Sequence, residues 1–430
     1  MKNTIKMSLA AAVAVSAFST SAFAGNLEEM IKGVDVSGYV DYRLEDKSID
    51  DKSATNNDRS ANWNEYSINV TVNSKINDIV SATVSAGFDE ITTVNSEDDA
   101  LRDTNGGITG GNGSVNSIVT ETADGDTTAP VSVDQAYFTF AMGNTTVMAG
   151  KQNIPSVFVD QKDTVKQGAG IVAVQRISDA ITLAGAHFLN NNIVSDTTTT
   201  ELIAMGNVSM FNYAVNYNMT DIASPANVNA NGVGVESKRY SIDLGAKVAG
   251  FTFDLRHTVA STDDRGTAKF EDAEVTKFSV GTSVAGIKLG ALYAVTNAQK
   301  GTADGLTAEN SNVAIDGDND AKVHAKIWQL STSGLNDGEV IAITADAPIM
   351  DKVTAGIAYA VAEGTNYDNA AKTGDREASE LLLKLTYKMS KNFTIHGRYS
   401  ILQDETKNTA GVKTADYSSD YSRLQLKYTF

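Results

Sequence analysis

Ser422–Phe430 reads SRLQLKYTF, and this stretch decides the fold. Every second residue from Leu424 to Phe430 is large and apolar, and the residues between them are polar. A period of two is typical of a β-strand with one apolar face and one wet face. In a transmembrane β-barrel the apolar face meets lipid, and aromatic residues gather at the membrane interface. The stretch therefore predicts the closing strand of an outer-membrane barrel, the strand that the barrel assembly machinery reads.

The N-terminus predicts export. Lys2 and Lys6 form a positive region, residues 7–18 (MSLAAAVAVSAF) form a short apolar run, and residues 22–24 (AFA) form a cleavage site. This is the pattern of a secretory signal peptide. The apolar run is shorter than the roughly 20 residues that a membrane-spanning helix needs. We therefore expect residues 1–24 to be cleaved and residues 25–430 to form a single barrel domain.

The composition narrows the class of protein. Lys and Arg number 35 against 53 Asp and Glu; without Lys2 and Lys6 the balance is 33 against 53, a net charge of −20. Such acidity argues against nucleic acid as a partner and is compatible with a pore that prefers cations. There is no cysteine, so no disulfide framework is available. No other segment resembles a spanning helix, and a hydrophilic chain can still cross a membrane as a barrel.

Strand patterns recur along the chain in hairpins. Tight turns are expected near residues 77, 143, 179, 210, 250, 286, 349 and 391. Eight hairpins give sixteen strands, and the first and last strands raise the count to about eighteen, with sixteen as the alternative. Alternation is blurred at 144–152, 169–177 and 200–209, and 322–331 suits either a loop or an extra strand. A soluble β-sandwich or β-helix would explain the alternation, but not the signal peptide together with the aromatic last strand.

Two stretches carry a resemblance to known proteins. Leu27–Gly38 (LEEMIKGVDVSG) is similar to the mature start of the Campylobacter-type major outer membrane porin family. Asp134–Phe140 leading into Ala149–Pro155 resembles the hairpin before the constriction loop of porins in general. The resemblance implies a homotrimeric, water-filled diffusion porin of about eighteen strands in the outer membrane. It also implies a bound Ca²⁺ in the pore, although the residues themselves require no cofactor.

The polar phase of the predicted strands supplies candidate pore-lining residues. The strand-borne candidates are all basic: Arg43, Arg239, Arg256, Lys384, Arg398, Arg423 and Lys427. Two interpretations are open. These residues either form a basic wall that sets up an electric field across the pore, or are ordinary charged side chains solvated by water in the lumen. Residues 153–168 follow a strand end and are the candidate inward-folded loop, in which Asp160 and Asp163 would line the constriction.

One acidic loop is a candidate metal site. Asp316, Asp318 and Asp320 stand at alternate positions, as in Ca²⁺ loops. Ala321 and Ile327 occupy the places where an EF-hand has Gly and Glu, which favours a solvated acidic loop instead.

The expected function is passive diffusion of ions and small hydrophilic solutes, with a moderate preference for cations. No nucleophile–base pair or metal-binding histidine motif indicates an enzyme. The alternative is a structural or adhesive surface barrel without an open channel. The expected partners are solutes, ions, outer-membrane lipid and lipopolysaccharide.

Overall fold

The computed structural model describes residues 34–52, 59–96, 131–158, 167–191, 197–222, 235–262, 272–297, 327–330, 335–368 and 371–430. Over these ranges it forms one sheet of eighteen strands. They are β1 (Val34–Asp51), β2 (Arg59–Lys75), β3 (Val80–Ser96), β4 (Ser132–Met142), β5 (Thr145–Asn153), β6 (Gln167–Arg176), β7 (Thr182–Asn191), β8 (Thr197–Val208), β9 (Phe211–Ile222), β10 (Val235–Val248), β11 (Phe251–Thr262), β12 (Ala273–Val284), β13 (Ile287–Thr296), β14 (Asn336–Met350), β15 (Val353–Asp368), β16 (Ala371–Lys388), β17 (Phe393–Asn408) and β18 (Lys413–Thr429). The described ranges contain no helix long and apolar enough to cross a membrane.

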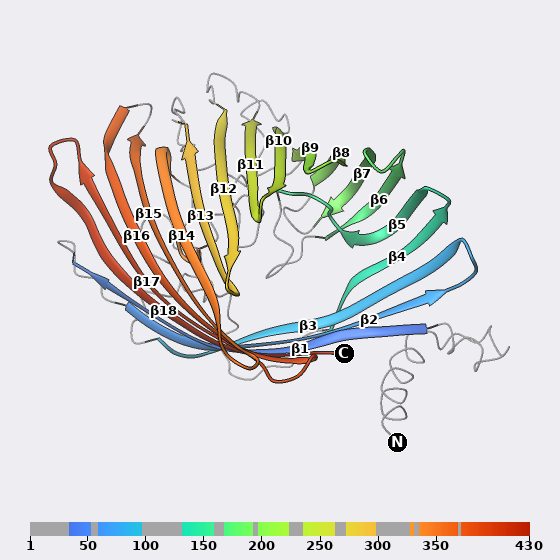
Figure 1. The fold of residues 1–430 in the computed structure, drawn as a ribbon, viewed down its shortest axis with the longest axis horizontal. Helices are drawn as coiled ribbons and strands as arrows, with labels where there is room; N and C mark the ends of the chain where they lie inside the picture. Colours follow the sequence, from blue (N-terminus) through green and yellow to red (C-terminus); the bar gives the residue numbers. More distant parts are fainter. Residues whose placement is uncertain are drawn as a thin grey trace.

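The sheet closes on itself. Each strand pairs antiparallel with the strands before and after it, and β1 also pairs with β18 from Tyr39–Thr429 to Asp51–Tyr417. In Figure 1 the blue β1 accordingly lies beside the red β18. Closure leaves no unpaired sheet edge, which is how a barrel satisfies its backbone within a membrane. The predicted count of eighteen strands is confirmed.

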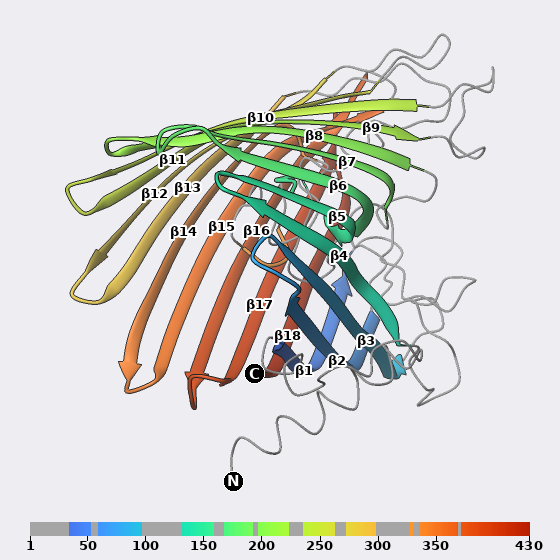
Figure 2. The same cartoon turned by 90° about the vertical axis from the view of Figure 1, so that its right-hand side faces the viewer.

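The eight tight turns lie at one end of the barrel, because each follows an even-numbered strand (Figure 2). Seven fall where the sequence predicts them. The turn expected near residue 349 lies at Asp351–Lys352, because β14 continues to Met350. The three segments with blurred alternation are strands β5, β6 and β8. Of the ambiguous segment 322–331, residues 327–330 are described, and they are not a strand.

The two faces of the wall differ as the period of two predicts. On β1, Tyr42 and Leu44 point outward and are 37% and 41% exposed, whereas the inward Arg43 is 8% exposed. Strands β14 and β15 depart from this rule around Val340–Ala342 and Ala358–Ala362, where both faces are apolar. Tyr359 points outward, while its neighbours Ala358 and Ala360 are almost fully buried on the inner side.

Candidate functional site: the charged inner wall

The seam between β1 and β18 carries a group of buried charges. Asp41, Arg43 and Glu45 occupy successive inward positions on β1, and each is less than a tenth exposed. In the closed barrel Arg43 lies opposite Gln425 of β18 and Glu65 of β2. Charges of both signs therefore meet where the first and last strands join.

Each predicted cation at this seam lies beside a carboxylate. Arg43 Nη1 is 2.9 Å from an oxygen of Glu65. Arg423 Nε is 2.9 Å from Glu45, and Lys427 Nζ is 3.8 Å from Asp41. Buried charges are costly to hold unless they are paired, so the carboxylates are part of the same arrangement as the basic residues.

Basic residues on the inner wall continue from β18 onto the neighbouring strands β17 and β16. Arg398 of β17 lies directly opposite Arg423 of β18 and, on its other side, Lys384 of β16. Lys384 Nζ reaches across β15 to Asp346 of β14, 2.9 Å away. The structure thus brings Arg398, Arg423 and Lys384 into one row on the inner wall.

A second charged group lies on β8 to β11. Glu201, which is almost fully buried, accepts a hydrogen bond from the Asn218 amide, and Arg239 Nη1 donates to Asn218 at 3.4 Å. On the adjoining strands Arg256 forms an ion pair with Asp243. Arg239 and Arg256 are therefore on the same face as the seam residues but in a separate group.

Two connecting segments pack against the inner wall. After β5, Ile154 and Phe158 are almost fully buried; Ile154 packs in one cluster with Phe188 of β7, and the Ser156 hydroxyl hydrogen-bonds Glu201. Before β14, Ile327–Leu330 packs against β16 to β18. The first of these segments begins the predicted inward loop 153–168. The sequence did not indicate the second.

A family model described as Campylobacter major outer membrane protein matches residues 1–345. The chain belongs to this family. The described barrel and the family together make it an outer-membrane porin with transmembrane β-strands. No curated protein matches the sequence.

Solved structures agree with the fold. Acinetobacter baumannii OccAB1 superposes with a TM-score of 0.61 at 11% identity, covering 96% of this chain and 99% of that one. Pseudomonas aeruginosa OpdQ superposes with a TM-score of 0.59 at 13% identity, covering 92% of this chain and 99% of that one. At such low identity the likeness concerns the barrel alone.

Several predicted site residues lie outside the described residues. They are the constriction candidates Asp160 and Asp163 and the metal candidates Asp316, Asp318 and Asp320. Among the residues that the structure describes, no three or more His, Asp or Glu side chains are grouped to hold a metal ion. The Ca²⁺ implied by the resemblance stays a prediction.

The acidic partners were missed at the level of sequence. Glu45, Asp243 and Asp346 are on the polar phase of their strands, so alternation alone could have placed them on the inner wall. Nothing local to them shows which basic residue each would meet, because the partners are on other strands. Attention to basic residues alone therefore gave an incomplete picture of the wall.

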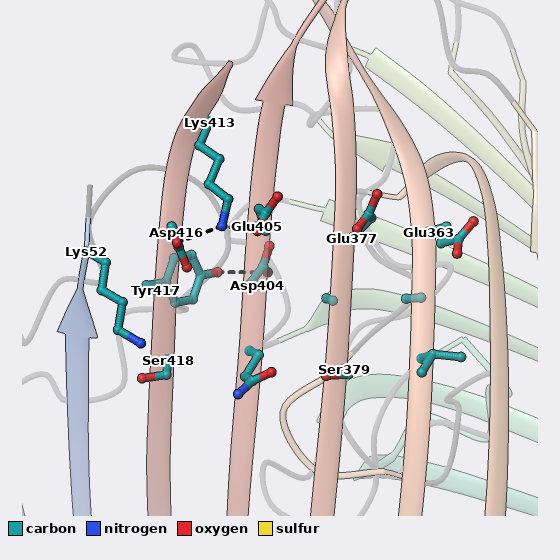
Figure 3. Close-up of a pocket in the computed structure, with 14 residues that line it drawn as sticks. Lys52, Glu363, Glu377, Ser379, Asp404, Glu405, Lys413, Asp416, Tyr417 and Ser418 are labelled. Atoms are coloured by element: carbon teal, nitrogen blue, oxygen red, sulfur yellow. Dashed lines mark hydrogen bonds and ion pairs between the residues drawn. The ribbon is translucent and has the colours of Figure 1, made fainter. Parts of the chain in front are cut away.

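A pocket of about 500 Å³ lies over the ends of β15 to β18 (Figure 3). Strand alternation puts Glu363, Glu377 and Glu405 of this pocket on the outward face. Lys407 lies 3.2 Å from Glu377 and 3.0 Å from Glu405, and Lys413 also pairs with Glu405. The pocket is thus an ionic patch on the outside of the wall and belongs to a different surface from the inner charges.

Proposed function

We propose that this porin is a passive channel for ions and small hydrophilic solutes. The observation that carries the proposal is the closed barrel whose inward positions are charged and polar over many strands. Paired charges such as Arg43–Glu65 and Lys384–Asp346 present ionic groups toward the lumen, as a water-filled pore requires. Porin membership favours a channel and not an enzyme.

We also propose a moderate preference for cations. The strand-borne basic residues lie beside carboxylates, as in Arg423–Glu45 and Arg256–Asp243, so their field along the pore is reduced. The whole chain carries a net charge of −18. Charges at a narrow point have the largest effect on selectivity, and Asp160 and Asp163 are our candidates for that point.

Single-channel recording tests both statements. Purified protein in a planar bilayer should give discrete conductance steps, and the reversal potential in a KCl gradient should indicate cation preference. The preference should weaken between 0.1 M and 1 M salt, because the Debye length falls from about 10 Å to about 3 Å. Silent bilayers would favour the structural or adhesive alternative.

Charge removal tests the proposed constriction. Asp160→Asn with Asp163→Asn should shift the reversal potential toward anions. Asp351→Asn, in a tight turn, is the matched control and should leave it nearly unchanged. An unchanged potential in the double variant would exclude these carboxylates from the narrow point, and anion preference in the unmodified protein would mean that the basic wall governs selectivity.

Three further proposals concern partners. The family resemblance implies the homotrimer and a Ca²⁺ in the pore, whereas the candidate ligands Asp316, Asp318 and Asp320 come from their alternate spacing in the sequence. A homotrimer would appear as a threefold mass in light scattering of the detergent-solubilised protein. Ca²⁺ bound through Asp316, Asp318 and Asp320 would appear as a calorimetric binding signal that Asp318→Asn weakens. Lipopolysaccharide would meet the outward ionic patch over β15 to β18, and Lys407→Ala and Lys413→Ala should then reduce its retention by the purified barrel.

A further inference from the structure

A buried carboxylate holds Ile327–Leu330 on the inner wall. Glu380 of β16 has no exposed surface. Its carboxylate accepts the backbone N–H groups of three consecutive residues: Trp328 at 3.2 Å, Gln329 at 2.8 Å and Leu330 at 2.6 Å. Ser400 Oγ donates a fourth hydrogen bond at 2.6 Å. Hydrogen bonds to an ionised acceptor are among the stronger ones in proteins, so Glu380 fixes the backbone of the segment.

Side chains of the same segment add contacts on β17 and β18. Gln329 donates from Nε2 to Ser400 Oγ at 2.9 Å and accepts at Oε1 from Ser419 Oγ at 3.0 Å. The Trp328 ring stacks on Tyr421 with 4.0 Å between the ring centroids. The segment is therefore bound to three adjacent strands by polar and aromatic contacts.

Two arginines of the basic row on the inner wall also contact the Trp328 ring. The guanidinium carbons of Arg398 and Arg423 lie 5.7 Å and 5.4 Å from the Trp328 ring centroid, within the range of a cation–π interaction. Trp328 thus covers two of the predicted pore-lining residues.

The inner wall has an apolar surface that matches the segment. Ile327, Trp328, Leu330 and Leu335 form one buried cluster with inward residues of β13 to β18 and with Ala61 and Trp63 of β2. The wall residues of the cluster on β14 to β16 are mostly small: Val340, Ala342, Ala358, Ala360, Ala362, Ala378 and Leu382. An uncovered apolar inner wall would be unfavourable in a water-filled lumen, whereas a docked segment removes it from water.

We propose that Glu380 is a positioning residue, and that the segment it docks is a resident element that narrows the channel. The segment occupies space on the lumen side of β14 to β18, so the conducting cross-section is smaller than that of the bare barrel. This inference rests on the proposed channel function, but the docking itself can be measured without any current.

The chain contains two tryptophans, Trp63 and Trp328, which makes the docking visible by fluorescence. In a Trp63→Phe background Trp328 is the sole tryptophan. Its emission should be blue-shifted and protected from iodide, because its side chain is buried. Glu380→Gln keeps the volume of the side chain but removes its charge and one acceptor oxygen. It should shift the emission to the red, increase iodide quenching and raise the single-channel conductance.

Glu377→Gln is the matched control, because Glu377 is on the same strand but on the outward face. It should change neither the fluorescence nor the conductance. Exposure of Trp328 in Glu380→Gln without a rise in conductance would overturn the narrowing role, and unchanged fluorescence would overturn the anchor role. A silent unmodified protein would instead refute the channel function itself, whatever the fluorescence shows.

A cysteine pair provides a second test if Glu380→Gln fails to fold. The chain has no cysteine, so Gln329→Cys with Ser400→Cys introduces a single possible disulfide. We expect it to form on oxidation of the folded barrel and to leave the conductance equal to that of the reduced channel. Gln329→Cys with Ser379→Cys, which faces outward, should not cross-link. A changed conductance on oxidation, or cross-linking of the Ser379 pair as fast as of the Ser400 pair, would show that the conducting state lacks the docked segment.

Discussion

At the scale of the residue, a missing side chain on β15 allows an ion pair to form across that strand. Gly356 lies between Asp346 and Lys384 in the register. A Cβ at Gly356 would stand 2.2 Å from Asp346 Oδ1 and 2.7 Å from Lys384 Cε. We predict that Gly356→Ala separates the pair and lowers the free energy of unfolding by about 1–3 kcal/mol, the usual range for overpacking. Urea unfolding in lipid vesicles measures this loss.

A double-mutant cycle provides the control. In an Asp346→Ala background the side chain that the new methyl group displaces is absent, so Gly356→Ala should cost clearly less. An equal cost in both backgrounds would mean that the ion pair is unrelated to the glycine.

At the scale of the element, two hairpins use the same strained turn. Ala249 and Gly250 both have positive φ, 51° and 84°, and Ala285 and Gly286 repeat this with 51° and 82°. Positive φ at both central residues matches the twist of a two-residue hairpin. In Ala a positive φ brings the Cβ atom into a steric clash that Gly and Asn largely avoid. The repeated Val-Ala-Gly sequence at 248 and 284 is therefore a recurring turn.

We predict that Gly250→Ala destabilises the barrel by about 1–2 kcal/mol through its backbone conformation. A Cβ there would meet no atom within 4 Å, so crowding plays no part. Ala249→Asn should be stabilising, because Asn tolerates positive φ. Gly281→Ala is the control: its φ is not positive and its nearest contact is 3.7 Å, so chemical unfolding should show little change. Equal losses at Gly250 and Gly281 would contradict the assignment.

At the scale of the whole molecule, the last residues complete the closure of the barrel. Gly38 and Phe430 exchange two backbone hydrogen bonds, each 3.0 Å long. Thr429 N donates to Asn392 O at 2.8 Å, and the rings of Tyr428 and Phe430 stack at 6.0 Å. The final residues therefore connect β18 to β1 on one side and to the β16–β17 turn on the other.

We predict that deletion of residues 428–430 abolishes assembly, because it leaves unpaired backbone at the closing seam. Heat-modifiable migration on gels, which distinguishes folded from unfolded barrels, is the measurement. Tyr428→Ala with Phe430→Ala keeps the backbone pairs, so that variant should assemble with reduced stability. Recovery of a folded barrel from the truncated chain would contradict this prediction.

The sequence by itself determined the strands, their faces and their turns. Alternation such as that of Leu424 and Leu426 is local, and so is the conformational demand of Ala249-Gly250, so neither needs knowledge of the rest of the chain. The same logic placed Arg43, Arg398 and Arg423 on the inner face. Closure followed once the last strand was recognised as a barrel strand.

Only the tertiary structure decided which charges pair and which segment lies inside. Glu45 meets Arg423, and Lys384 meets Asp346 across Gly356, because of the strand register, which joins residues distant in sequence. Inward positions of β14 and β15 such as Val340, Ala342 and Ala358 are apolar, which a period of two does not predict. They are covered by Ile327–Leu330, and a local pattern cannot show what a distant segment will bury.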